Sequence, residues 1–245
     1  MRFAAIADIH GNALALEAVL ADIAAQGITD IVNLGDCFSG PLEADKTADR
    51  LLALNLPTVR GNHDRYLTEF SPEHMQTSDE AAFHDLAPHH LDWLRTLPPE
   101  LVYRGEAYLC HATPGNDNLY WTETVAADGS VSLKAQAEIE ALAEGITQPL
   151  ILCGHTHLPR IIALSGGRLL VNPGSVGCPA YDDDQPYFHK VENGHPMASY
   201  AILEKSADRW TAHFRTVAYD HMAMSELAKT NGRPEWAAGL AKGRL

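Results

Sequence analysis

The chain has 245 residues and a formal net charge of −14, from 32 Asp and Glu residues against 18 Lys and Arg residues. Such a charge repels the backbone of long nucleic acid, which we therefore do not expect as a partner. Hydrophobic residues make up 46% of the chain, enough for a sizeable core. No stretch reaches the roughly 18 consecutive apolar residues that a membrane span needs. We expect a cytoplasmic protein with no membrane partner, folded as one domain because no boundary is visible over residues 1–245.

The first sixty residues alternate short apolar runs with segments of helical periodicity. Leu16, Val19 and Ile23 share one helical face, and Asn12 and Gly27 are suited to cap that helix at its two ends. Strand and helix in strict alternation favour a parallel sheet with right-handed crossovers. We expect strands at residues 3–8, 28–34 and 57–60, and helices at residues 13–26 and 43–54.

The rest of the chain predicts a more antiparallel arrangement. Residues 62–97 have a polar, helical pattern, and two short apolar runs around Arg104-Gly105-Glu106 predict a hairpin. Two turn signals make residues 112–133 a loop excursion that we expect to shape substrate choice. We further expect a helix at residues 134–144, strands ending at 153 and at 159–164, 168–171, 198–204 and 209–217, and a last helix with a partly mobile tail within 220–245.

The cysteines and several histidines are predicted to play structural roles. No two cysteines form a CxxC pair, so neither a zinc ribbon nor a thioredoxin motif is present, and we expect small core residues instead. The histidines of the polar helical stretch follow no strand and no turn glycine. The residues concerned are Cys37, Cys110, Cys153, Cys178, His74, His84, His89 and His90.

Residues with metal-binding side chains follow five of the apolar runs. The clearest case is the run that ends at Cys153, which continues as Gly154-His155-Thr156-His157. Carboxylate, imidazole and amide groups without thiolate suit a divalent ion such as Mn, Fe, Zn, Co or Ni. The candidates are too many for one ion but suit two ions that share a carboxylate, for which Asp36 is the natural bridge. The candidate ligands are Asp8, His10, Asp36, Asn62, His111, His155 and His157.

The order of these motifs resembles the calcineurin-like metallophosphoesterase superfamily over roughly residues 3–177. The matching motifs are Asp8-Ile9-His10, Gly35-Asp36, Gly61-Asn62-His63-Asp64, His111 and Gly154-His155-Thr156-His157. The longer stretches 35–41, 59–64 and 171–177 resemble the small bacterial and archaeal phosphodiesterase branch. In the Ser/Thr protein phosphatase branch a serine and then an arginine normally follow the GNHE motif, whereas here Arg65 follows Asp64 directly.

The resemblance implies an α/β fold, a four-layer αββα sandwich of two mixed sheets with helices on both outer faces. It implies one ion held by Asp8, His10, Asp36 and His157, and a second held by Asp36, Asn62, His111 and His155, with manganese favoured. It further implies in-line attack on a phosphoester by a hydroxide that bridges the ions. His63, oriented by Asp64, would act as the general acid toward the leaving group.

Three other functions remain open from the sequence: a Ser/Thr protein phosphatase or other phosphomonoesterase, a nuclease, and a non-catalytic interaction module of the same fold. The intact ligand set disfavours the module, and the negative charge disfavours the nuclease. Small phosphodiesters are the favoured substrates, because only Arg60, Arg65 and Arg160 could add a guanidinium near the motifs. Tyr120 and Trp121 either stack on a flat leaving group or anchor their loop. A homo-oligomer is left open.

Overall fold

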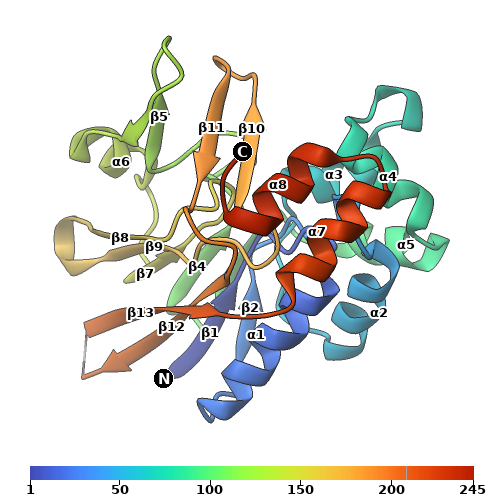
Figure 1. Cartoon of the computed structure of the whole chain (residues 1–245). Helices are drawn as coiled ribbons and strands as arrows, with labels where there is room; N and C mark the ends of the chain where they lie inside the picture. The colour runs from blue at the N-terminus through green and yellow to red at the C-terminus, as the bar shows by residue number, and fades with distance from the viewer. Residues whose placement is uncertain (208) are drawn as a thin grey trace.

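The computed structural model of the protein describes residues 1–207 and 209–245, and its centre is a pair of packed mixed sheets (Figure 1). The first sheet has the strand order β13-β12-β1-β2. β1 runs parallel to β2 and antiparallel to β12, which pairs in turn with β13 along its whole length. Its strands are β1 (Arg2–Ile6), β2 (Ile31–Asn33), β12 (Ala198–Ser206) and β13 (Arg209–Val217).

The second sheet has the order β3-β4-β7-β9-β8. Its three central strands run parallel to one another, and an antiparallel strand closes each edge. The three central strands are buried almost throughout, as expected for parallel strands covered on both faces. The strands are β3 (Glu100–Tyr103), β4 (Ala107–Cys110), β7 (Leu150–Leu152), β8 (Arg160–Ala163) and β9 (Leu169–Asn172).

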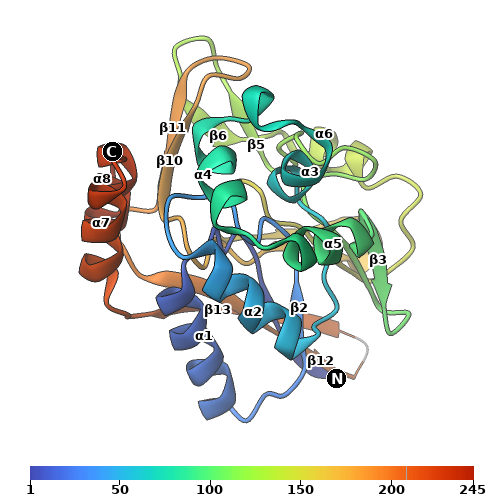
Figure 2. The same cartoon turned by 90° about the vertical axis from the view of Figure 1, so that its right-hand side faces the viewer.

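The two sheets enclose an apolar core and are covered by helices on their outer faces. Phe3, Leu109 and Leu203 are fully buried in the layer between the sheets. Five helices cover the first sheet (Figure 2), and α6 (Gln136–Leu142) covers the second through Ile139. These five are α1 (Ala13–Ala25), α2 (Ala44–Leu54), α3 (Asn62–Glu69), α4 (Thr77–Asp85) and α5 (Pro88–Thr96). Short 3₁₀ turns lie between α3 and α4 (Pro72–His74) and between β8 and β9 (Ser165–Gly167). The predicted αββα sandwich is confirmed.

Two small hairpins and a helical pair stand outside the sandwich. The hairpins are β5 (Glu123–Val125) with β6 (Val131–Leu133), and β10 (Ala180–Asp183) with β11 (His189–Glu192). Where the sequence predicts one helix and a tail, the structure has two helices, α7 (His221–Thr230) and α8 (Pro234–Lys242), packed together through Met224 and Leu240. None of the described helices is long and apolar enough to cross a membrane.

Local predictions hold where the pattern is strong. Asn12 caps α1, since its side chain accepts a hydrogen bond from the Ala15 amide at 3.1 Å, and Gly27 has a φ of 69° just beyond the helix. All four cysteines are buried. The predicted strand at 57–60 is wrong in extent, because only Thr58 forms a bridge, to Asn33. Pro57 has no amide hydrogen to donate, and the chain turns away at Gly61.

Candidate metal centre

The predicted ligands gather at one edge of the sandwich because they follow strands that run the same way. Asp8 and His10 come after β1, and Asp36 comes after β2 in the same sheet. In the second sheet His111 comes directly after β4, while His155 and His157 come after β7. The carboxyl ends of parallel strands meet at one edge, so segments more than a hundred residues apart converge there. Asn62 joins them as the first residue of α3.

The backbone is left-handed at most of these ligands. The φ angle is 55° at Asp8, 52° at His10, 55° at Asp36, 71° at His155 and 57° at His157. Residues other than glycine rarely adopt this conformation, which costs on the order of 1–3 kcal/mol where it is imposed. The surrounding loops impose it here. The amides of Ile9 and His10 both donate to the Asp36 carbonyl, at 2.9 and 3.1 Å.

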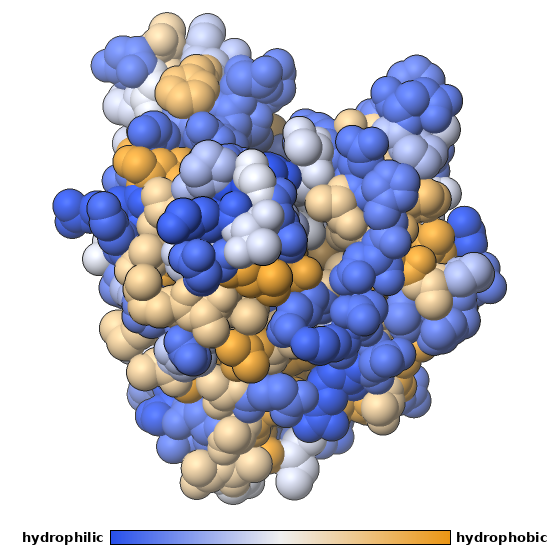
Figure 3. All heavy atoms as spheres, turned by 45° about the vertical axis from the view of Figure 1, so that its right-hand side comes forward, coloured by the Kyte–Doolittle hydropathy of each residue, from blue (hydrophilic) through white to orange (hydrophobic). Residues whose placement is uncertain are grey.

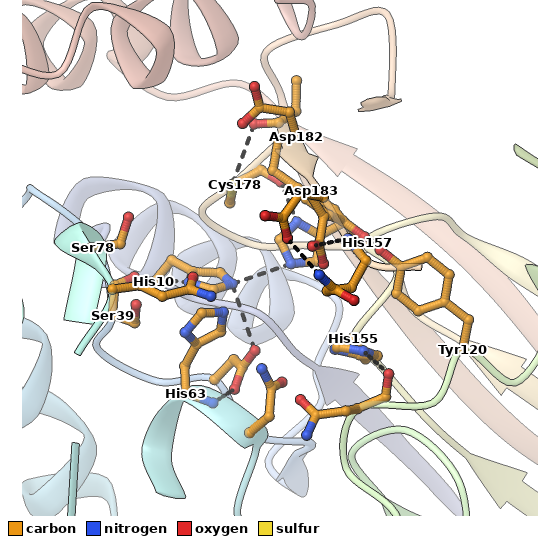
Figure 4. A pocket seen from close by; sticks show the side chains of 18 of the residues that line it. His10, Ser39, His63, Ser78, Tyr120, His155, His157, Cys178, Asp182 and Asp183 are labelled. Carbon is orange, nitrogen blue, oxygen red and sulfur yellow. Dashed lines mark hydrogen bonds and ion pairs between the residues drawn. The ribbon is translucent and has the colours of Figure 1, made fainter. Parts of the chain in front are cut away.

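One group of ligand atoms is formed by Asp8, His10 and His157, all of them buried. The Nε2 atoms of His10 and His157 are 3.1 Å apart, and His157 Nε2 lies 3.6 Å from Asp8 Oδ1. Figure 4 shows the two imidazoles pointing toward each other, with His63 below them. The arrangement offers two nitrogens and a carboxylate to a common point.

A second group is formed by Asp36, His111 and His155. His111 Nε2 lies 3.1 Å from Asp36 Oδ2 and 3.0 Å from the amide oxygen of Asn62. Asn62 therefore lies where it can add a fourth ligand to this group. The Nε2 atom of His155 contacts the Asn118 carbonyl at 3.1 Å, which leaves Nδ1 of His155 as its metal-binding atom.

Asp36 lies between the two groups. Its Oδ2 atom is 3.9 Å from His10 Nε2 in the first group and 3.1 Å from His111 Nε2 in the second. Its Oδ1 atom accepts a hydrogen bond from the His63 amide at 3.0 Å. A Cβ at Gly61 would overlap this carboxylate, so only glycine leaves room for it. A carboxylate so placed can serve both groups.

The imidazoles are held in the tautomer that metal ligation requires. The Nδ1 atoms of His10, His111 and His157 donate to the backbone carbonyls of Ser39, Leu34 and Cys178 at 2.7 to 2.8 Å. In the neutral rings of His10 and His157 the proton then sits on Nδ1, and the lone pair of Nε2 points into the site. At His111 burial opposes charge, yet the Asp36 carboxylate raises the pKa to about 10, so a cation at its Nε2 would displace a proton. Such hydrogen bonds to the far ring nitrogen are typical of metal-binding histidines.

The charges of the site fit bound cations. Burial lowers the pKa of His10 to about 4 and holds that of His157 far below its usual range, so both rings are neutral at pH 7. Their two facing lone pairs then repel each other unless a cation lies between them. Burial also raises the pKa of Asp8 to about 8. A divalent ion would relieve both the repulsion between the imidazole lone pairs and the cost of a buried, ionised Asp8. The donor set therefore suits the divalent metals predicted from the sequence.

His63 lies beside the clusters and is held by a residue that the sequence did not single out. Its Nδ1 atom contacts Oδ1 of Asp79, a fully buried residue of α4, at 2.7 Å. Burial opposes charge on His63, yet the carboxylates of Asp79 and Asp36 raise its pKa to about 9. Asp79 follows no strand and belongs to no motif, so no local pattern could have pointed to it.

The prediction that Asp64 orients His63 is wrong. The Asp64 carboxylate instead accepts hydrogen bonds from three backbone amides, those of Asp36, Cys37 and Gly61, each at 2.9 Å. Asp64 is the third residue of α3, and its side chain turns back to the loop that precedes the helix. Its contacts fix the backbone that carries Asp36.

The clusters open into a cleft of about 1050 Å³. One wall is built by the β10–β11 hairpin and the loop around Tyr120, and the other by α3, α4 and the start of α8. Figure 3 shows the surface hollowed between two protruding lobes. The C-terminal residue Leu245 and Trp236 of α8 also line the cleft, so the end of the chain contributes to the site.

The three arginines of the motif loops are paired away from the clusters. Arg65 makes a two-pronged contact with Asp117 at 2.7 and 2.8 Å, Arg60 pairs with Glu69 at 3.2 Å, and Arg160 pairs with Glu123 at 2.9 Å. The cations that line the cleft are others, Lys134 and Arg233. Sequence reasoning missed both, because neither lies near a motif.

Tyr120 and Trp121 point in opposite directions from the loop excursion. Tyr120 lies against the His155 ring, with 5.1 Å between centroids, and its hydroxyl contacts Tyr181 at 2.7 Å and His189 at 2.9 Å. Trp121 is 1% exposed and donates its indole hydrogen to the Ile139 carbonyl under α6. Trp121 therefore anchors the loop, and Tyr120 is the residue that faces the cleft.

Replacing Trp121 with alanine should lower the free energy of unfolding by about 3–5 kcal/mol, because it empties a buried site between the loop and α6. Denaturant unfolding measures this loss. The ratio of KM values for nucleotide and simple aryl substrates should stay within about twofold, since Trp121 does not reach the cleft. A changed ratio at unchanged stability would restore the stacking role for Trp121.

A third group of ligand-type residues has a different explanation. Asp49 of α2 and His89 of α5 are exposed, and the buried His90 lies beside them. His90 Nδ1 accepts the Ala87 amide at 3.1 Å, so its proton sits on Nε2 and is donated to Asp49 at 2.9 Å. Both ring nitrogens are used in capping α5 and joining it to α2, as expected for a satisfied histidine.

Comparison with known proteins agrees with this geometry. Residues 1–194 match the calcineurin-like phosphoesterase superfamily domain. The chain belongs to this superfamily. The predicted resemblance and the prediction of a phosphoesterase are thereby confirmed, and with its Asp and His clusters the protein is a metallophosphoesterase with candidate metal sites.

Individual relatives of this metallophosphoesterase span nearly its whole length. An uncharacterized protein of Methanocaldococcus jannaschii is 27% identical over 255 aligned positions, covering 95% of this chain and 94% of its own. The crystal structure of a metallophosphoesterase from Sphaerobacter thermophilus is similar with a TM-score of 0.74, 28% identity and 99% coverage of both chains. A hypothetical protein from Pyrococcus horikoshii shares the fold, with a TM-score of 0.76, 20% identity and coverage of 99% and 98%.

Proposed function

We propose that this metallophosphoesterase hydrolyses small phosphodiesters with two divalent metal ions, manganese favoured, bound by Asp8, His10, Asp36, Asn62, His111, His155 and His157. The observation that carries the proposal is the position of Asp36, whose Oδ2 atom is within 4 Å of a ligand nitrogen in each of the two groups. Ions in such a pair supply Lewis acidity toward the phosphoryl oxygens and the attacking water.

The residues of the chain then position the substrate and move a proton. His63 projects into the cleft beside His10, with 5.5 Å between the ring centroids, and is no member of either ligand group. Asp79 holds its Nδ1 atom, so Nε2 is the atom free to face the substrate. We assign His63 the role of general acid that protonates the leaving alkoxide, and Asp79 the role of positioning residue.

The charges of the cleft support a diester over a monoester. A monoester is nearly a dianion at neutral pH, and sites that prefer it add cations to the metals. Outside the ligand groups, the cleft is lined by five carboxylates and two cations. Arg233 is already paired with Glu235 at 2.5 Å, and Lys134 donates to the Tyr120 carbonyl. The remaining acids include Asp182, Asp183 and Asp184 of the β10–β11 hairpin.

The comparison of kcat/KM for bis-p-nitrophenyl phosphate and p-nitrophenyl phosphate, with the same Mn²⁺ concentration, tests the substrate class. We expect the diester to be preferred once the values are corrected for intrinsic reactivity, because the second negative charge of the monoester meets surplus carboxylates. A clear preference for the monoester would instead make the protein a phosphomonoesterase. Protein treated with chelator, with and without Mn²⁺ added back, provides the control for metal dependence.

A further inference from the structure

A polar recess flanks His63 on the side of the cleft formed by α4 and α8. Ser39 and Ser78 line it together with Arg233, the residue just before α8. The segments are joined, since the Gly40 amide donates to the Ser78 carbonyl at 3.1 Å. Ser78 also precedes Asp79, the partner of His63, so the same helix turn positions His63 and one wall of the recess. Figure 4 shows Ser39 and Ser78 on the same side of His10.

The recess holds hydrogen-bond donors that lack acceptors. The Ser39 hydroxyl and the Nη1 atom of Arg233 are buried, and neither has a partner within residues 1–207 and 209–245. The Ser78 hydroxyl oxygen accepts from Arg233 Nη2 at 3.0 Å and from the Trp236 indole at 3.2 Å, which leaves its own hydrogen to donate. Buried donors are nearly always paired, so the Ser39 and Arg233 groups, with the half-buried Ser78 hydroxyl beside Arg233, mark a place for a ligand with acceptor oxygens.

The charge of the recess is set by one ion pair. Arg233 Nε binds Glu235 at 2.5 Å, and the side chain of Glu235 is 40% exposed at the rim. The buried Nη1 edge of the guanidinium is not used in this contact. A guanidinium edge beside the Ser78 hydroxyl, in a recess that Ser39 also lines, matches the oxygens of a carboxylate or a phosphate. Glu235 weakens that attraction without blocking the edge.

We propose that Ser39, Ser78 and Arg233 bind a carboxylate or phosphate carried by the leaving alcohol of the substrate. The inference rests on the proposed function, because the leaving alcohol is placed next to the recess by the role of His63 as its proton donor. The substrate class is then a phosphodiester with a second anionic group on its leaving side. That charge lies apart from the phosphoryl group, where the two metals already balance the charge of the diester.

Binding of leaving-group probes to the Mn²⁺-loaded protein tests the recess without turnover. The probes are 4-hydroxybenzoate and its neutral analogue 4-hydroxybenzamide, titrated by calorimetry. Arg233→Gln should weaken the benzoate about tenfold and leave the benzamide within about twofold, since one charge-assisted contact is lost. Ser39→Ala should show the same selectivity with a smaller effect.

Glu235→Gln should change the affinity for benzoate in the direction opposite to Arg233→Gln. Removing this carboxylate should tighten benzoate binding by about threefold or more, because the guanidinium loses its competing partner. The matched control is Glu226→Gln on α7, which removes the same charge from an exposed ion pair with Lys229 outside the cleft. The control should leave both affinities as in the parent protein. Equal effects of Arg233→Gln on the two probes, or weaker benzoate binding in Glu235→Gln, would overturn the recess proposal.

Kinetics on matched diesters separates the recess from the proposed function. The substrates are methyl 4-carboxyphenyl phosphate and methyl 4-carbamoylphenyl phosphate. Arg233→Gln should lower kcat/KM about tenfold for the first and little for the second. If both diesters are hydrolysed and Arg233→Gln lowers kcat/KM equally for the two, the recess proposal is overturned while the diester function stands. If neither diester is turned over but probe binding keeps its Arg233 dependence, the diester function fails and the recess stands.

Discussion

Asp36→Asn should lose most of both metal ions, because this one side chain lies within reach of ligand nitrogens from both groups. Asparagine keeps an oxygen that can accept the His63 amide hydrogen, so the α3 backbone should stay in place. The change removes one charge and one ligand oxygen from a buried site, where a lost ligand weakens metal binding by well over the roughly 10- to 100-fold seen for outer-shell changes. Elemental analysis of the purified variant after dialysis measures the effect.

His157→Ala is the matched comparison for Asp36→Asn. Of the two ligand groups, His157 belongs only to that of Asp8 and His10, so its loss should remove mainly one of the two ions. A metal content in Asp36→Asn close to that of the parent protein would show that Asp36 does not bridge. Equal loss of both ions in both variants would point to binding that is cooperative rather than shared through Asp36.

His63→Asn should keep its metals and lower kcat by roughly 10²- to 10⁴-fold for diesters with poor leaving groups. The reason is geometric, since His63 faces the cleft but belongs to neither ligand group. The loss should shrink for p-nitrophenolate, which leaves without needing a proton. Steady-state kinetics over a series of leaving groups tests this through the slope of log kcat against the pKa of the leaving group. Equal losses on good and poor leaving groups would exclude the acid role.

Asp79→Asn separates positioning from proton transfer. The amide still contacts His63 Nδ1 but no longer compensates an imidazolium, so kcat should fall less than in His63→Asn and KM should change little. Asp64→Asn is the contrasting variant, because its carboxylate contacts the amides around Asp36. That variant should weaken metal binding instead, and metal content together with kcat distinguishes the two residues.

The candidate metal ligands could be picked out from the sequence because each follows an apolar run. Strands ending at Ile6, Cys110 and Leu152 are short and buried, and the residues that follow them stand out as polar. Parallel strand order then places those residues at a common edge. The alternation of strand and helix predicts only a parallel sheet with right-handed crossovers, whereas the αββα layering was implied by the resemblance of the motifs to the superfamily.

The residues that sequence reasoning missed lie where no local pattern could reveal them. Asp79 is in the first turn of a helix, a common place for an aspartate, and its contact with His63 spans sixteen residues. Arg233 reaches the cleft only because α8 folds back over α4, and its contact with Ser78 spans 155 residues. Asp64 adjoins His63 in sequence, but adjacency does not fix where a helical side chain points, and its carboxylate faces the amides of Asp36, Cys37 and Gly61.

The left-handed backbone at Asp8, His10, Asp36, His155 and His157 sets stability and metal binding against each other. Glycine would adopt these conformations without the steric cost of a Cβ, but glycine offers no ligand atom. At roughly 1–3 kcal/mol for each of these residues, the metal-free fold carries a burden on the order of 5–15 kcal/mol that bound ions would offset, since they would bind the native state and not the unfolded chain. A lineage of this fold that no longer needed its ions could relieve this backbone strain by substitution to glycine only where the buried hydrogen bonds of the lost side chain were replaced, as at the Ser39 carbonyl that His10 now satisfies.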